Sequence, residues 1–243
     1  MRYAIIGDIH GNADALSVVV RAIKESNIDK VVCLGDIVGY GAEPVRCIEM
    51  VQEMQCACIV GNHDWAAIDR IAIDFFNAYA KTAAQWTRAQ LSPEHKRFLG
   101  DLPLHVSLEH FAISHGTFHQ PESFNYIQTV FDAQLSFDVL KSMNHRVGFL
   151  GHSHVPVAFF NTEPIAYSLD PIVPVQPERM TIINSGSVGQ PRDENPRASF
   201  AIYDTEVLRT EIIRLDYDID AAAEKIRRAG LPEILAARLY HGK

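Results

Sequence analysis

The sequence lacks the features of several large classes of protein. It has only 4 cysteines among 243 residues, and they form no disulfide framework, which favours a reducing compartment. No apolar run approaches the length of a membrane span, and Asp8 comes too early in the chain for a signal peptide. We therefore expect a cytoplasmic protein with no membrane-spanning segment.

Positive charge is also scarce. The formal net charge is −8, and the lysines and arginines are scattered. Proteins that hold nucleic acid through its backbone need a concentrated basic surface, so we expect no stable nucleic-acid binding. The sequence also contains no Gly-x-Ser-x-Gly nucleophile elbow and no Gly-x4-Gly-Lys-Ser/Thr phosphate loop, so neither of those chemistries is indicated.

Linkers and internal repeats are absent too. With 243 residues and 47% hydrophobic content, the chain is long enough for one large domain or two small ones. The polar blocks described below extend from residue 8 to residue 154, so a boundary between them would divide their site. We expect one domain over residues 1–243.

Short apolar runs, each ending at a glycine followed by Asp or Asn, dominate the N-terminal quarter of the chain. Such runs are typical of strands that are covered on both faces. Strands are expected at 3–6, 31–34 and 57–60, with amphipathic helices at 12–26 and 43–54. This order predicts right-handed parallel crossovers, which place the loops after the strands at one edge of one sheet.

The rest of the chain is richer in predicted strands. Helices are expected from Asp64 to about Gln90, after Ser92, from about residue 220 and near residue 231. Strands are expected at 111–114, 147–150, 157–160, 181–184, 199–203 and 208–215. Residues 207–216 partly alternate between apolar and polar, as an antiparallel edge strand would. We expect an α/β fold with two sheets packed face to face and helices outside.

Five polar blocks follow these strands. They are Asp8-Ile9-His10, Gly35-Asp36, Gly61-Asn62-His63-Asp64, Ser114-His115-Gly116 and Gly151-His152-Ser153-His154. Any one block alone also fits a turn, a helix cap or a structural histidine. All five together, in this order and at strand ends, indicate a site for two transition-metal ions, because such sites combine oxygen ligands with imidazoles.

The residue types in these blocks also bear on the substrate. Asp36 is the only acid of its block and is our candidate for a carboxylate that bridges two metals. Asn62 offers a neutral oxygen, which adds no charge that would repel an anion. Two divalent cations against only Asp8 and Asp36 leave a net positive centre, which suits an anionic substrate.

The blocks, read together, resemble the motifs of calcineurin-like metallophosphoesterases of the small prokaryotic phosphodiesterase type. The resemblance is carried by Gly7-Asp8-Ile9-His10-Gly11-Asn12, Gly35-Asp36-Ile37-Val38-Gly39, Gly61-Asn62-His63-Asp64, His115-Gly116 and Gly151-His152-Ser153-His154. Residues 184–188 resemble a further segment of the smaller prokaryotic members. The resemblance implies a four-layer α/β/β/α sandwich with two mixed β-sheets.

The resemblance also implies a role for each residue. One metal would bind Asp8, His10, His154 and the bridging Asp36; the second would bind Asp36, Asn62, His115 and His152. His63 would stabilise the transferring phosphoryl group or protonate the leaving oxygen. A metal-bound water would attack phosphorus in line. Manganese is favoured as the metal, and iron, zinc, nickel or cobalt also suit these ligands.

The second block departs from the pattern Gly-Asp-x-Val-Asp-Arg-Gly of protein phosphatases and diadenosine tetraphosphatases. Gly39 stands where they have the Asp that orients the histidine, and Tyr40 where they have the Arg that holds a phosphate oxygen. A phosphodiester carries one charge on its phosphorus and needs less cationic clamping, so we expect a phosphodiesterase. Arg192 or Arg197 could partly replace the missing arginine, or each could be an ordinary surface charge.

Two other functions stay open at this point. One is a phosphomonoesterase resembling the protein phosphatases or the diadenosine tetraphosphatases. The other is a non-catalytic metal-binding scaffold, although a scaffold has no chemical need for all seven candidate ligands.

The expected partner is a small phosphoester or nucleotide-like substrate. Aromatic residues in segments 117–131 and 156–177, together with Phe75, Phe76 and Tyr79, could stack on a nucleobase near the site. Packing of these loops over the core is the alternative interpretation.

Overall fold

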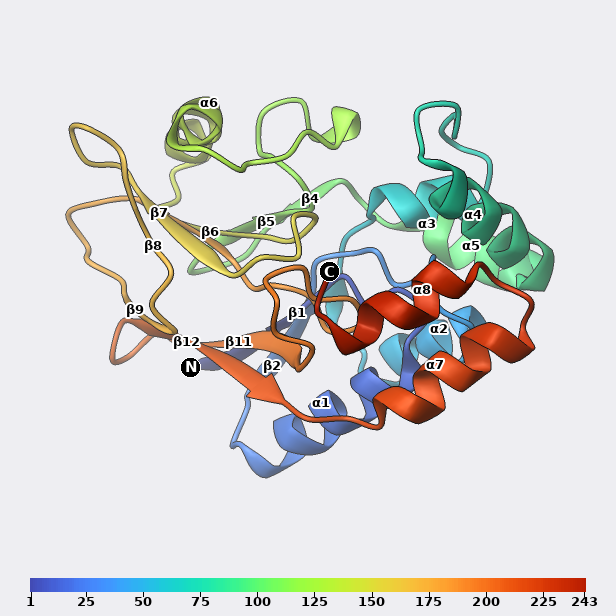
Figure 1. Ribbon diagram of the computed structural model, residues 1–243. Coiled ribbons are helices and arrows are strands. Elements are labelled where there is room, and N and C mark those ends of the chain that lie inside the picture. Colours follow the sequence, from blue (N-terminus) through green and yellow to red (C-terminus); the bar gives the residue numbers. More distant parts are fainter.

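The computed structural model describes residues 1–243 and contains two six-stranded sheets that pack face to face (Figure 1). The strand order is β3-β2-β1-β11-β12-β9 in the first sheet and β4-β5-β6-β10-β7-β8 in the second. Each sheet mixes parallel and antiparallel pairs. The predicted α/β/β/α sandwich of two mixed sheets is therefore confirmed.

The elements have the following bounds. The strands of the first sheet are β1 (Arg2–Ile6), β2 (Lys30–Cys33), β3 (Ala57–Cys58), β9 (Ile172–Pro174), β11 (Ala198–Asp204) and β12 (Arg209–Leu215). The strands of the second sheet are β4 (His105–Ser107), β5 (Ala112–Ser114), β6 (Val147–Leu150), β7 (Val157–Phe160), β8 (Ala166–Ser168) and β10 (Thr181–Asn184). The α-helices are α1 (Ala13–Glu25), α2 (Pro44–Glu53), α3 (Asn62–Ala67), α4 (Ala78–Gln90), α5 (Pro93–Asp101), α6 (Val130–Ser142), α7 (Ile219–Arg228) and α8 (Glu233–Ala237). The short 3-10 helices are η1 (Pro121–Ser123) and η2 (Arg238–Tyr240).

Helices form the two outer layers of the sandwich. On the first sheet, Leu16 of α1 and Ile48 of α2 pack into one cluster with Phe200 of β11. On the second sheet, Phe137 of α6 packs into a cluster with Phe159 of β7. Figure 1 shows α1 below the first sheet and α6 above the second. No helix combines the length and the apolar character needed to cross a membrane.

The layer between the sheets is apolar and rich in aromatic rings. Tyr3 of β1 and Tyr203 of β11 meet Phe111 and Phe149 from the second sheet. Tyr3 points into this layer, whereas its neighbour Ala4 belongs to the cluster under α1 and α2. Burial on both faces explains why β1 reads as a continuous apolar run in the sequence.

Two parallel crossovers set the position of the polar blocks. The order β1-α1-β2-α2-β3 is built as predicted, with β2 lying parallel to β1 and β3 parallel to β2. In the second sheet, β5 runs parallel to β6. The loops that follow these strands therefore gather at the carboxyl edges of the sheets.

Some expectations for the individual elements were wrong. The helix expected from Asp64 to Gln90 is divided into α3 and α4 by the irregular segment 68–77. Asn77 caps α4 by accepting a hydrogen bond from Ala80 N, and this local bond begins a new helix instead of continuing the old one. Strand β12 is antiparallel, as expected, but β9 pairs with it and takes the edge position.

The sequence reading also missed the helix α6 and the short strands β4, β8 and β9. The buried residues of α6 follow helical spacing, but Phe131 and Leu135 on its outer side are 87% and 53% exposed. These exposed apolar residues blur the pattern that identifies an amphipathic helix. Thr129 and Asp132, which form a capping box, are the local sequence signal for the start of α6.

The C-terminal helices pack beside the first sheet and close over Tyr40. Ile226 of α7 and Leu239 of η2 share a cluster with this ring. The ammonium group of Lys225 in α7 lies 2.8 Å from carboxylate oxygens of both Asp14 and Glu43. The chain after residue 217 is thereby attached to the segments that follow β1 and β2.

The core between the sheets gives a stability prediction. Phe149 is fully buried against Phe111 and Tyr203, so Phe149→Ala should lower the free energy of unfolding by about 3–5 kcal/mol through lost burial and a cavity. The matched control is Phe131→Ala, whose side chain is 87% exposed and should change stability by less than about 0.5 kcal/mol. Urea denaturation measures both, and equal losses for the two variants would contradict this description of the core.

Candidate metal centre

The structure brings all eight predicted site residues to one place. Asp8 and His10 follow β1 and Asp36 follows β2, while Asn62 and His63 begin α3 directly after the loop from β3. His115 follows β5, and His152 and His154 follow β6. Every one of these side chains is at most 9% exposed. Residues from both sheets thus form a single buried polar cluster.

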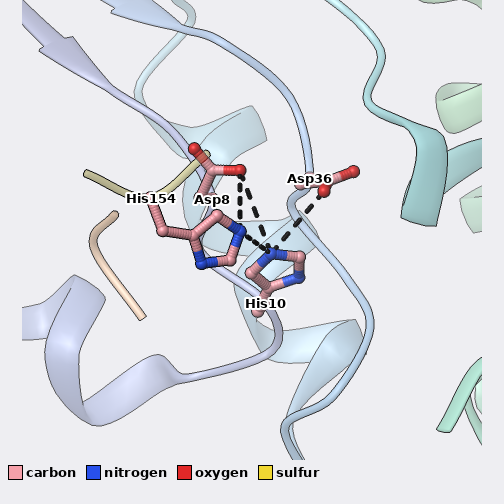
Figure 2. A group of neighbouring side chains, drawn as sticks. All are labelled: Asp8, His10, Asp36 and His154. Carbon is pink, nitrogen blue, oxygen red and sulfur yellow. Dashed lines mark hydrogen bonds and ion pairs between the residues drawn. The ribbon is translucent and has the colours of Figure 1, made fainter. Parts of the chain in front are cut away.

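One group of candidate ligands consists of Asp8, His10, Asp36 and His154, whose ligand atoms lie within 4.8 Å of one another (Figure 2). The Nε2 atom of His154 lies 3.3 Å from Asp8 Oδ1, and the Nε2 atom of His10 lies 3.6 Å from Asp36 Oδ2. Figure 2 shows these atoms converging on a common centre. The arrangement could hold one metal ion.

The imidazole rings of His10 and His154 face each other as two ligands of one cation would. Their Nε2 atoms are only 3.0 Å apart. The Nδ1 atom of His10 meets the Val38 carbonyl oxygen at 3.1 Å, and that of His154 meets the Gln190 carbonyl oxygen. Because Nδ1 must carry the hydrogen to donate to a carbonyl, the Nε2 atom of each neutral ring presents a lone pair. Two facing lone pairs fit a shared positive ion.

A second group, formed by Asp36, His115 and His152, could hold another ion. Four buried atoms here have no hydrogen-bond partner: Asp36 Oδ2, Asn62 Oδ1, His115 Nε2 and His152 Nε2. Buried polar atoms without partners are rare in folded proteins, and a bound metal ion would satisfy all four. Asp36 belongs to both groups, so its carboxylate lies where a bridging ligand would be needed.

Protonation supports the same interpretation. Burial alone would lower the pKa of His115, but the Asp36 carboxylate raises this pKa to about 10. The Nδ1 atom of His115 lies 2.7 Å from the Leu34 carbonyl oxygen, so the additional proton would be on Nε2, which is 3.3 Å from Asp36 Oδ2. Imidazole ligands bind metals in their deprotonated form, so a metal ion at this position takes the place of that proton.

The backbone at the cluster is unusual. Asp8, His10, Asp36, His152 and His154 all have left-handed conformations, with φ between 49° and 68°. Residues other than glycine rarely adopt this conformation, and clusters of them mark functional sites. A Cβ atom on Gly151 would lie 2.5 Å from Asp8 Oδ2, so glycine is needed where the two loops meet.

Asp64 is a site residue whose role the sequence reading did not identify. It is fully buried, and its Oδ1 accepts hydrogen bonds from the backbone N–H groups of Ile37 and Val38 at 2.9 and 3.1 Å. Its Oδ2 accepts one from Gly61 N at 3.0 Å. Asp64 therefore fastens the loop after β2 to the loop after β3. Its position three residues after Gly61, typical of a capping box, was the available signal.

His63 is held by rings and not by a carboxylate. Its ring centroid lies 4.4 Å from that of Tyr40, 4.9 Å from that of Phe76 and 5.0 Å from that of His10. Its Nδ1 atom is enclosed and has no hydrogen-bond partner. Burial lowers the pKa of His63 to about 4, so the imidazole is neutral at neutral pH.

Of the two arginines considered from the sequence, only Arg192 reaches the site. Its Nη2 donates to Gln190 Oε1 at 3.1 Å and to the Tyr40 hydroxyl at 3.4 Å, while its Nε is buried without a partner. Burial lowers the pKa of His154, and the charge of Arg192 lowers it further, which places the guanidinium beside the cluster. Arg197 is exposed and bonds to Asn195.

A hollow of about 360 Å³ adjoins the cluster. It is lined by Asn62, His63 and His152, and by aromatic residues that include Phe76 and Tyr126. Segment 117–131 therefore contributes to the wall beside the cluster. Residues of segments 117–131 and 156–177 together line a separate, mostly apolar groove of about 510 Å³, and none of the eight candidate site residues lines it.

Comparisons with known proteins show the family of this chain. The model of the calcineurin-like phosphoesterase superfamily domain matches residues 1–207. An uncharacterized protein of Methanocaldococcus jannaschii is 38% identical over 99% of this chain and 98% of its own length. The crystal structure of a metallophosphoesterase from Sphaerobacter thermophilus is 36% identical, covers 100% of this chain and 99% of its own, and has a TM-score of 0.89.

A hypothetical protein from Pyrococcus horikoshii shares the fold, with a TM-score of 0.79 at 21% identity over 100% of this chain and 98% of its own. The family model covers far more than half of the chain, and the M. jannaschii relative is similar over nearly its full length. The chain therefore belongs to the calcineurin-like phosphoesterase superfamily, and it is a metal-dependent hydrolase of phosphoric esters.

Proposed function

We propose that the protein is a phosphodiesterase that works with two divalent metal ions. One ion would be held by Asp8, His10, Asp36 and His154, and the other by Asp36, Asn62, His115 and His152. The shared Asp36 and the partnerless buried atoms around it support this assignment. When bound, two such ions lower the pKa of a water and neutralise the charge that builds on phosphoryl oxygens. Manganese is our first choice of metal, and iron, zinc, nickel or cobalt also suit donors that combine oxygen and imidazole.

The ligand side chains are prepared by their own hydrogen bonds. The carbonyl oxygens of Val38, Leu34 and Gln190 accept from the Nδ1 atoms of three of the histidines, which fixes ring orientation and leaves Nε2 free. The Oδ1 atom of Asp36 accepts from His63 N at 2.8 Å, so Oδ2 is the atom left toward the cluster centre. The metal-ligand atoms are thus already oriented toward the centre of the cluster.

His63 would act on the substrate and not on the metal. Since its Nδ1 is enclosed, Nε2 is the atom available to the hollow beside it. The low pKa of His63 supports donation of a hydrogen bond from the neutral ring to a phosphoryl or leaving-group oxygen. Packing against Tyr40 and Phe76 would hold the ring in place for this contact.

The observation that carries the preference for diesters is the uncharged pair Gly39 and Tyr40 beside His63. A Cβ atom at position 39 would lie 2.7 Å from His63 Nδ1, so no acidic side chain fits there in this arrangement. Tyr40 presents a ring to His63 where the protein phosphatase pattern has an arginine. A loop without a guanidinium suits the single negative charge of a phosphodiester better than the two charges of a monoester.

Arg192 would supply the remaining positive charge from another part of the chain. It lies against Tyr40, so it comes close to the position of the missing arginine. Its Nη2 bonds to Tyr40 and Gln190, and these bonds hold the guanidinium beside the cluster. We assign one of the remaining N–H groups of this guanidinium to a non-bridging phosphoryl oxygen, a contact that a phosphodiester can accept.

Turnover of two matched substrates tests the proposal. With manganese, the protein should hydrolyse bis(p-nitrophenyl) phosphate about 10-fold or more faster, as kcat/KM, than p-nitrophenyl phosphate. The control Asp8→Ala removes a ligand of one metal and should lose both activities, with less metal retained in elemental analysis. A preference for the monoester would overturn the diester assignment, and full activity without metal would overturn the metal scheme.

Introducing the aspartate of the protein phosphatase pattern at position 39 should damage the enzyme. In Gly39→Asp, the new Cβ would contact His63 Nδ1 in a backbone with a φ of +95°, so His63 would be displaced. We expect kcat to fall about 100-fold, the usual size of a lost electrostatic or acid contribution, while metal content stays near that of the wild type. Steady-state kinetics with metal analysis measures this, and an unchanged or higher kcat would contradict the packing argument.

Variants of Arg192 and Arg197 test whether Arg192 contacts the phosphoryl group. Arg192→Ala should lower kcat/KM for the diester about 10- to 100-fold, the loss expected for a hydrogen bond to a charged group. Arg197→Ala removes an exposed charge from the same segment and should stay within about 2-fold of the wild type. If both variants behaved alike, Arg192 would have no specific contact with the phosphoryl group.

A further inference from the structure

The hollow of about 360 Å³ beside His63 lies next to the proposed position of the phosphoryl group. Asn62, His63 and His152 line it, so it adjoins the place where the phosphoryl group would lie under the proposed function. His63 stands between the metal ligands and Phe76, which also lines the hollow. A group bonded to the leaving oxygen beside His63 would therefore extend into this space.

The composition of the walls limits what can bind. The hollow has 13 lining residues, and none of them is a lysine, arginine, aspartate or glutamate. A second phosphate, as in a dinucleotide polyphosphate, would have no cation to accept it there. Apolar side chains predominate, so the hollow fits an uncharged organic group.

Aromatic rings in the hollow present faces that no protein group covers. Phe75, in the segment between α3 and α4, is 98% exposed although its side chain is large and apolar. Tyr126 is 45% exposed and stacks on His152, with ring centroids 3.8 Å apart and an interplanar angle of 18°. Exposed aromatic rings next to a catalytic site are typical of a surface for stacking a planar ligand.

Polar groups are available at the same place. Asn77 and Ser123 line the hollow beside the rings. The side-chain oxygen of Asn77 accepts the hydrogen bond that caps α4, which leaves its amide hydrogens free to be donated. Donors next to stacking rings suit a heterocycle that carries acceptor atoms on its edge, more than a plain hydrocarbon.

We propose that this hollow binds the leaving alcohol of the substrate, and that this alcohol is a nucleoside whose base stacks on Phe75 and Tyr126. The inference rests on the proposed function for the position of the phosphoryl group. In the reaction, a P–O bond forms to the oxygen of water and the P–O bond to the nucleoside breaks. One proton of the water ends on the nucleoside hydroxyl, so the products are a nucleoside and a phosphomonoester.

Binding of adenosine, which carries no phosphate, tests the inference by isothermal titration calorimetry of the metal-loaded protein. The wild type should bind adenosine at least about 10-fold more tightly than ribose, because the base supplies the stacking. In Phe75→Ala, the affinity for adenosine should fall about 5-fold or more, with the affinity for ribose unchanged. Phe131→Ala removes an equally large ring that is 87% exposed on α6, away from the hollow, and should leave adenosine binding unaltered.

Several outcomes would overturn the inference. They are equal binding of adenosine and ribose, wild-type affinity in Phe75→Ala, and binding of hexanol as tight as that of adenosine, which would indicate a general apolar pocket. Because adenosine binding does not depend on turnover, the two proposals can fail separately. A protein that binds adenosine through Phe75 but hydrolyses only monoesters would keep the nucleoside site and lose the diester assignment.

Discussion

The arrangement of the site depends on Asp36, a buried carboxylate surrounded by imidazoles. Burial alone would raise its pKa, but His115 and His63 hold this pKa well below the usual range, so the group stays charged. One oxygen accepts the His63 backbone N–H, and the other faces His10 and His115 without a hydrogen bond. A buried charge is stable only when it is compensated, and two cations would compensate both Asp36 and Asp8.

Sharp turns at one end of the sandwich bring the candidate ligands together. Ligands from two sheets can meet only if the chain turns sharply after each strand, and the left-handed residues at Asp8, Asp36 and His152 make those turns. Asp64 then links two of the loops through three backbone N–H groups. The helices and the aromatic core between the sheets hold the strand ends rigidly, so the donor atoms stay together although their charges and lone pairs would separate them.

The sequence was sufficient to predict the layers, the parallel crossovers and the gathering of eight polar residues at one end of the sandwich, because apolar runs followed by polar residues are local patterns. It was insufficient where contacts are made over long distances. Arg192 reaches Tyr40 across 152 positions, and no local pattern distinguishes it from Arg197. The role of Asp64 depends on N–H groups 26 and 27 positions away. Helix α6 was missed because exposed apolar residues obscured its period.

The aromatic residue Tyr40, which follows the second block, connects the C-terminal helices to the site. Tyr40 packs with Ile226 and Leu239, which lie beyond residue 207, where the family match ends. The ring that replaces an arginine is therefore held by a part of the chain outside the family domain. Since the same ring contacts His63 and Arg192, the C-terminal segment stabilises the orientation of both groups. Under the proposed function, substrate preference would therefore depend on packing around Tyr40, and substitutions at Ile226 or Leu239 would alter it.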